Sequence, residues 1–128
     1  MTKEEMVAYW VKSSREDVET AEALFESKRY VACLFYCHLF VEKILKAVIV
    51  YETGEPAPYG HKLLHLGQQT KIPWSKEQLD ILDELTKFNI RARYEDYKFS
   101  LHKRATAQFT KTYLSRAQNI YLWIQQKM

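Results

Sequence analysis

The sequence predicts an all-α protein, folded as an antiparallel up-and-down bundle of four long helices and one short helix. Apolar residues recur at helical spacing through most of the 128 residues, and no segment alternates apolar and polar residues as a strand would. The chain has only three Gly and three Pro, few for an all-β protein, which needs many turns. Its length and its 47% hydrophobic content suit one buried core, so we expect a single domain over residues 1–128.

The first helix is expected from about Lys3 to Glu26. Thr2 and Glu5 have the spacing of a capping box at a helix start. The apolar residues that follow at helical spacing are Met6, Val7, Trp10, Val11, Val18, Ala21, Leu24 and Phe25. The pattern breaks at residues 27–29, so we expect a short link there.

The second helix, from Tyr30 to about Tyr51, is apolar on most sides, as is typical of a central helix enclosed by neighbours or by a second copy of the chain. Glu42 and Lys46 stand four residues apart in the favourable order, so we expect them to pair. Buried polar side chains need partners, and for the polar residues of this helix a structural role is favoured over the support of a functional site. These residues are His38, Glu42, Lys43 and Lys46.

The second half of the chain contains one clear loop, from Thr53 to Gly60, which holds two Gly and two Pro residues. A short helix is expected over residues 61–69. A capping box at Ser75 and Gln78 then predicts the start of a fourth helix, the third long one, which continues to about residue 92. We expect a polar connection over residues 95–103 and a last long helix from about residue 104.

The segment 89–97 combines two arginines, two tyrosines and two carboxylates at the end of the fourth helix. Arginine binds phosphate-like anions through paired N–H groups, and tyrosine offers a stacking face. The guanidinium groups diverge if the helix continues and could converge if it unwinds at the second arginine. The alternative is that Arg93 pairs with Glu95 or Asp96 and that Tyr94 packs into the bundle. The candidate nucleotide- or RNA-binding residues are Arg91, Arg93, Tyr94, Asp96 and Tyr97.

Two histidines are of interest. His61 lies at a helix start, where it could assist an anion site, but a structural role is favoured, in which it caps the helix or forms a hydrogen bond to Glu42. His102 is the only plausible acid–base group near the arginine cluster, because its pKa starts close to neutrality. A nuclease that used Arg93 and His102 would have to bring them together across a loop.

Several classes are disfavoured by composition. Cys33 and Cys37 lie four apart in an apolar helix, where buried free thiols are expected rather than a disulfide. The four histidines are scattered, so no metal is expected, and no Gly-rich loop or other enzyme template suggests a cofactor. A net charge of +3 permits an anionic partner without demanding one. The polar N-terminus and the lack of a long apolar run favour a cytoplasmic protein.

Taken together, the motifs resemble the HEPN domain family (higher eukaryotes and prokaryotes nucleotide-binding), in its small stand-alone prokaryotic form. The Glu-Lys-x-Leu-Lys-Ala signature is matched over residues 42–47, and the His-x-Leu-x-x-Leu signature over residues 61–66. The family's Ala-Arg-Tyr-Pro-Asp-Tyr corresponds to residues 92–97, with Glu95 in place of the common Pro. Further matches are Trp10, Asp17, Val18, Ala21, Arg29, Tyr30, Ala32 and Cys33.

The resemblance implies a helical bundle that is often a homodimer, that associates with nucleotides or RNA, and that is often paired with a minimal nucleotidyltransferase in a toxin–antitoxin-like system. Many members are metal-independent ribonucleases with an Arg-x(4–6)-His motif, which is missing here because eight residues separate Arg93 from His102. A non-catalytic, nucleotide- or RNA-associated protein is therefore expected. The alternatives are a divergent ribonuclease toxin that uses Arg93 and His102, and a homodimeric structural interaction module.

Overall fold

A computed structural model describes the backbone of all 128 residues and every side chain except those of residues 95–97. The backbone forms six helices and no strand, which confirms the all-α prediction. The helices are α1 (Lys3–Glu26), α2 (Tyr30–Thr53), α3 (Leu63–Gln68), α4 (Lys76–Arg91), α5 (Glu95–Arg104) and α6 (Ala107–Gln125).

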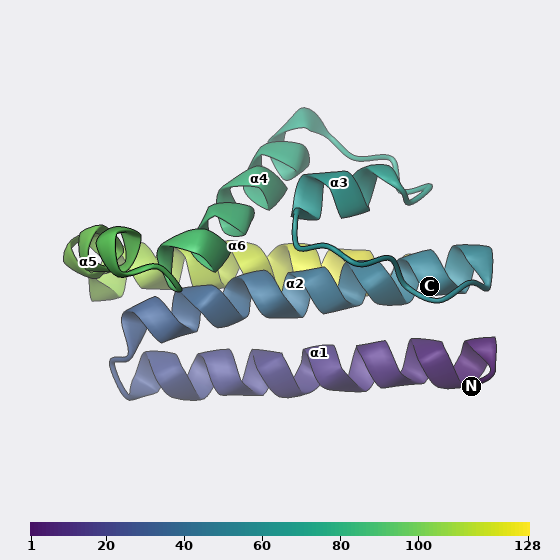
Figure 1. Cartoon of the computed structure of the whole chain (residues 1–128), viewed down its shortest axis with the longest axis horizontal. Helices are drawn as coiled ribbons and strands as arrows, with labels where there is room; N and C mark the ends of the chain where they lie inside the picture. The colour runs from purple at the N-terminus through teal and green to yellow at the C-terminus, as the bar shows by residue number, and fades with distance from the viewer.

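The long helices surround α2 (Figure 1). Helices α1 and α2 lie side by side in opposite directions, and α6 packs along another side of α2. Helix α4 is inclined to the other three, with α3 beside it, and α5 lies at the end of the molecule where α1 turns into α2 (Figure 1). The four long helices are therefore not all aligned.

The expected polar connection over residues 95–103 is wrong, because this segment forms helix α5. Its sequence has little apolar periodicity, and Leu101, which is 1% exposed, anchors it to the core. Its last turn is basic, which suits the negative end of a helix dipole. The last helix accordingly begins at Ala107 rather than near Arg104, with Thr106 accepting a hydrogen bond from the Phe109 backbone N–H at 3.2 Å.

Both predicted capping boxes are present, at Thr2 with Glu5 and at Ser75 with Gln78. The α1–α2 turn depends on Lys28, whose φ of 63° lies in the left-handed region. That conformation lets the Arg29 backbone N–H return to the Leu24 carbonyl at 2.8 Å. A residue with a Cβ is strained in this conformation where glycine would not be, so the turn carries a small backbone strain.

The core is built around α2, as its apolar composition predicts. Phe40 is fully buried and meets the ring of Tyr121 from α6 edge-on, with the ring centroids 5.5 Å apart. Cys33 and Cys37 are buried and unbonded, as expected. The hydrogen bond of Cys33, together with burial, raises the pKa of the Cys37 thiol well above its usual value. Among the helices that the structure describes, none combines the length and apolarity needed to cross a bilayer.

Candidate functional site

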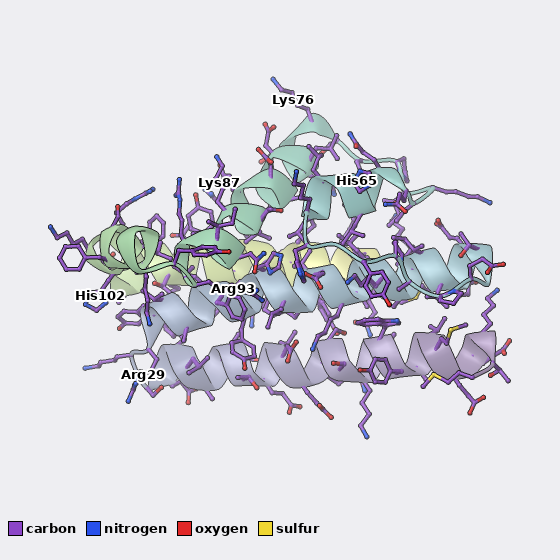
Figure 2. The ribbon with its side chains drawn as sticks, in the orientation of Figure 1. Arg29, His65, Lys76, Lys87, Arg93 and His102 are labelled. Atoms are coloured by element: carbon purple, nitrogen blue, oxygen red, sulfur yellow. The ribbon has the colours of Figure 1, made fainter. Side chains whose placement is uncertain are left out.

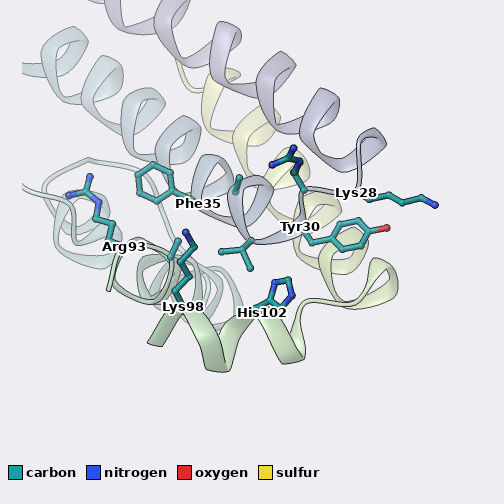
Figure 3. Close-up of a pocket in the computed structure, with 10 residues that line it drawn as sticks. Lys28, Tyr30, Phe35, Arg93, Lys98 and His102 are labelled. Carbon is teal, nitrogen blue, oxygen red and sulfur yellow. The ribbon is translucent and has the colours of Figure 1, made fainter. Parts of the chain in front are cut away.

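A hollow of about 410 Å³ lies where the α1–α2 turn and the start of α2 approach the α4–α5 junction and α5 (Figure 3). We call it the Arg93 hollow. Basic side chains from three separate segments line it, which concentrates positive charge that the mild net charge of the chain does not reveal. These side chains are Lys28, Arg29, Arg93, Lys98 and His102.

The rest of the lining is apolar and aromatic, and includes Tyr30, Val31 and Phe35. The Arg93 guanidinium carbon lies 5.2 Å from the centre of the Phe35 ring, within the range of a cation–π contact. Stacking on a ring face leaves the N–H groups at the edge of a guanidinium available to an anion. The hollow can thus offer charge, directional donors and an aromatic surface together.

Arg93 and His102, the pair that the sequence suggested for a nuclease, both line this hollow. Figure 3 shows Lys98 between them. Both side chains are exposed to solvent. In this arrangement, each can contact a bound ligand, but they do not form a joined acid–base pair.

The other candidates of the segment 89–97 do not gather at one site. Helix α4 ends at Arg91, and this side chain lines a different hollow, against α6, so the two arginines diverge. Tyr94 is 60% exposed, so the alternative that it packs into the bundle is wrong. The side chains of Glu95, Asp96 and Tyr97 lie outside the described residues, and their proposed pairings remain predictions.

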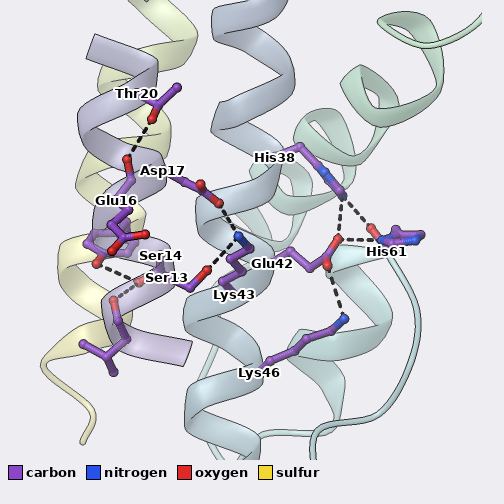
Figure 4. Close-up of polar contacts among 12 residues, drawn as sticks. Ser13, Ser14, Glu16, Asp17, Thr20, His38, Glu42, Lys43, Lys46 and His61 are labelled. Carbon is purple, nitrogen blue, oxygen red and sulfur yellow. Dashed lines mark hydrogen bonds and ion pairs between the residues drawn. The ribbon is translucent and has the colours of Figure 1, made fainter. Parts of the chain in front are cut away.

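Of the four residues that were expected to support the site, Glu42, Lys46 and His61 form one polar network, and Lys43 contacts α1 instead (Figure 4). Glu42 accepts hydrogen bonds from His61 Nδ1 at 2.8 Å and from Lys46 Nζ at 3.2 Å. The predicted Glu42–Lys46 pair is confirmed, and of the two structural roles expected for His61 the bond to Glu42 is the one observed. Lys43 Nζ pairs with Asp17 at 2.7 Å. Glu42, Lys43, Lys46 and His61 do not line the Arg93 hollow, and their contacts are structural.

His38 completes this network from the inside. Its side chain is fully buried, and its Nε2 lies 2.9 Å from the His61 carbonyl oxygen and 3.4 Å from Glu42. The Nε2–H tautomer fits this geometry, because the carbonyl can only accept. Burial lowers the pKa of His38, so the neutral ring is favoured. No group of three or more metal-ligating side chains is found in the part of the chain whose side chains are described.

Sequence reasoning missed Lys28, Arg29 and Lys98 as members of the site. In the sequence, Lys28 stands only in the break between two helices, Arg29 is a family match without an assigned role, and Lys98 lies in the segment expected to be a polar connection. A basic pair at a helix–helix turn was the available signal, but only the fold brings that turn beside α5 (Figure 2).

Comparisons with known proteins agree with this fold. The model of the HEPN domain family matches residues 7–127. The crystal structure of TT1696 from Thermus thermophilus superposes with a TM-score of 0.83 at 18% identity, covering 95% of this chain and 98% of that one. ST0689, an archaeal HEPN homologue, gives a TM-score of 0.73 at 20% identity, covering 94% and 96%. These structural similarities concern the fold alone. No curated protein gives a significant match.

Proposed function

This chain belongs to the HEPN domain family, and we propose that it binds the phosphates of RNA or of a nucleotide in the Arg93 hollow without cleaving them. The observation that carries the proposal is the convergence of Lys28, Arg29, Arg93, Lys98 and His102 on one hollow. Phosphate contacts by Lys and Arg supply most of the non-specific affinity for nucleic acids.

Two further features support a ligand with both charge and a flat face. Phe35 and Tyr30 line the same hollow, and single-stranded nucleic acids combine backbone contacts with base stacking on aromatic rings. Lys28 keeps a left-handed backbone conformation where glycine would relieve the strain. The Lys28 side chain lines the hollow, so its ammonium group can contact a bound phosphate there.

The absence of cleavage is proposed from the separation of the two groups that a nuclease would need. Lys98 lies between Arg93 and His102 in the hollow (Figure 3), and the spacing of Arg93 and His102 in the sequence departs from the family's ribonuclease motif. A general acid or base must reach within hydrogen-bond distance of the reacting proton. A ligand phosphate held by Arg93 is therefore not also held against His102.

The proposal is tested by fluorescence anisotropy with a labelled single-stranded RNA of about ten nucleotides, a length typical of one single-strand site. We expect R93A/K98A to weaken binding about tenfold or more and to lower the slope of log affinity against log salt by about one. The charge-matched control is R15A/K76A, because Arg15 is exposed on α1 and Lys76 lies at the far tip of α4 (Figure 2). Equal weakening by both double variants, or no binding by the wild type, would reject the proposal.

Arg93 and His102 line the same hollow, and this favours a second candidate function, that of a metal-independent ribonuclease. Incubation with total RNA in the presence of a chelator tests it directly. Cleavage that disappears in His102→Ala would support this activity in place of binding alone. Intact RNA over a wide range of protein concentrations would exclude it.

We also propose, from the family resemblance, a homodimer that acts with a minimal nucleotidyltransferase in a toxin–antitoxin-like pair. The exposed Phe99 ring on α5 supports an interface there. Analytical ultracentrifugation is expected to give a dimer that Phe99→Asp dissociates. Co-expression with a minimal nucleotidyltransferase encoded beside this chain should yield a complex that survives size-exclusion chromatography.

A further inference from the structure

A second hollow, of about 210 Å³, lies on the other side of the α4–α5 junction, between α4 and the beginning of α6. We call it the Arg91 hollow. Lys87 and Arg91 stand one turn apart on α4, and Arg104 reaches the same hollow from the end of α5. Three cationic groups thus come together from two helices, at a place that the proposed function does not use.

Arg104 is held in a way that leaves its guanidinium N–H groups able to bind an anion. The Arg104 guanidinium carbon lies 5.4 Å from the centre of the Phe109 ring, much as Arg93 lies over Phe35 in the first hollow. Among the described side chains, Glu84 is the one carboxylate in the lining, and Arg116 pairs with it at 3.7 Å. The described charges of the hollow therefore remain positive on balance.

The wall beside these cations is aromatic. The ring of Tyr113 lies 5.1 Å from that of Phe88 and 4.9 Å from that of Phe109, so the three rings form one packed group. Burial, assisted by Glu84, raises the pKa of Tyr113, so the phenol adds no negative charge to the hollow. The hollow is about half the volume of the first, which suits a phosphate group better than a whole nucleotide.

The two hollows are related by the local chain geometry. Arg91 and Arg93 are two residues apart and point to opposite sides of the junction, and His102 and Arg104 divide in the same way. The Arg93 hollow thus receives Arg93 from the junction with Lys98 and His102 from α5, and the Arg91 hollow receives Lys87 and Arg91 from α4 with Arg104 from the end of α5. Tyr94 stands between the two arginines and α5 in sequence and is 60% exposed, so its ring is available for stacking at the junction.

We propose that the Arg91 hollow is a second phosphate site, and that one strand of RNA crosses the α4–α5 junction with phosphates in both hollows. This inference rests on the proposed function, since the first hollow must bind RNA for the strand to continue. It identifies the ligand as single-stranded RNA of more than a few nucleotides rather than a free nucleotide. A mononucleotide would occupy the Arg93 hollow alone.

The test is a length series. Binding of labelled RNAs from about two to about ten nucleotides is measured for the wild type, K87A/R91A, R93A/K98A and the charge-matched control R15A/K76A. We expect K87A/R91A to bind the shortest RNAs like the wild type and the longest ones about tenfold more weakly, with a smaller salt slope. R93A/K98A should weaken binding at every length.

Two outcomes overturn the second site without touching the first. The affinity of K87A/R91A could equal that of the control at every length, or it could fall equally at every length. A wild type that binds no RNA would instead reject the proposed function, and the inference with it. Circular-dichroism melts identify any variant with disturbed folding, and K87Q/R91Q, which keeps side-chain length, then replaces the alanine pair.

Discussion

His61 Nδ1 donates a hydrogen bond to Glu42 Oε1 at 2.8 Å, although the two residues stand nineteen positions apart in the sequence. The bond fastens the end of the loop before α3 to the middle of α2 (Figure 4). The carboxylate is nearly buried, with its side chain 6% exposed, and the same group also holds Lys46. One acidic side chain therefore joins a surface loop, a buried lysine and the central helix.

Replacing this carboxylate should destabilise the fold strongly. Glu42→Gln leaves the Lys46 ammonium, 8% exposed, without its charge partner, and such a loss costs about 3 kcal/mol in the free energy of unfolding. Urea denaturation measures the change. The double variant E42Q/K46M should recover part of the loss, because it removes the stranded charge as well. If E42Q unfolds at the wild-type urea concentration, the network carries little stability.

His38 should make stability depend on pH. Its pKa in the folded protein is lowered by burial, below the ordinary value of 6.5, so the unfolded chain takes up its proton first. The contribution of His38 to the free energy of unfolding is fully present above pH 6.5. It is lost as the pH falls below 6.5, by at most about 1.4 kcal/mol per pH unit.

Thermal melts between about pH 7.5 and about pH 5.5 test this dependence. His38→Gln keeps a side-chain donor for the His61 carbonyl but cannot titrate, so its melting temperature should fall less over the same range. Glu42, His61 and Arg93 also influence the pKa of His38. All three remain in the variant, so the comparison isolates the His38 ring. An equal fall in variant and wild type would assign the pH dependence to other groups.

The Tyr121 hydroxyl provides a buried hydrogen bond between α6 and α1. It lies 2.9 Å from Ser14 Oγ, which itself donates to the Val11 carbonyl at 2.7 Å, so Tyr121 is the donor. Tyr121→Phe should cost about 1 kcal/mol of unfolding free energy, measured by denaturant titration. Tyr59→Phe is the matched control, because Tyr59 is fully exposed and should lose nothing. Equal stability of the two variants would contradict a contribution from this bond.

Lys28 should show opposite effects on stability and on binding. Lys28→Gly relieves the strain of the left-handed conformation and should raise the free energy of unfolding by about 0.5–1 kcal/mol. The same change removes a cation from the rim of the Arg93 hollow, so RNA binding should weaken. Lys28→Ala separates the two effects, since it loses the charge and keeps the strain. A Gly variant that gains stability and binds RNA normally would remove Lys28 from the site.

The sequence predicts most of the fold because the long helices carry their own signals. The capping boxes at Thr2 and Ser75 and the apolar spacing place α1, α2 and the start of α4 to within a few residues. Helix α5 has no such signal. Its order comes from Leu101 packing in the core, and a single buried leucine in a polar segment does not reveal that contact in advance.

The candidate site was only half accessible to sequence reasoning. Arg93 and His102 stand near each other in the chain, and their residue types suggest phosphate chemistry directly. The contribution of Lys28 arises in the tertiary fold, which brings a turn some seventy residues away beside α5. The separation of Arg91 from Arg93 depends on where α4 stops, and helix ends are the least certain part of a sequence-based prediction.

The length of the turn at Lys28 also sets how α2 is rotated about its own axis relative to α1. Each residue advances an α-helix by about 100°. Deleting one residue from this three-residue link would oblige α2 either to unwind or to rotate by that angle against α1. Rotation would carry Phe35 away from the Arg93 guanidinium and push Glu42 toward a different neighbour. The length of one short turn thus governs both the aromatic face of the hollow and the anchoring of a loop in the middle of α2.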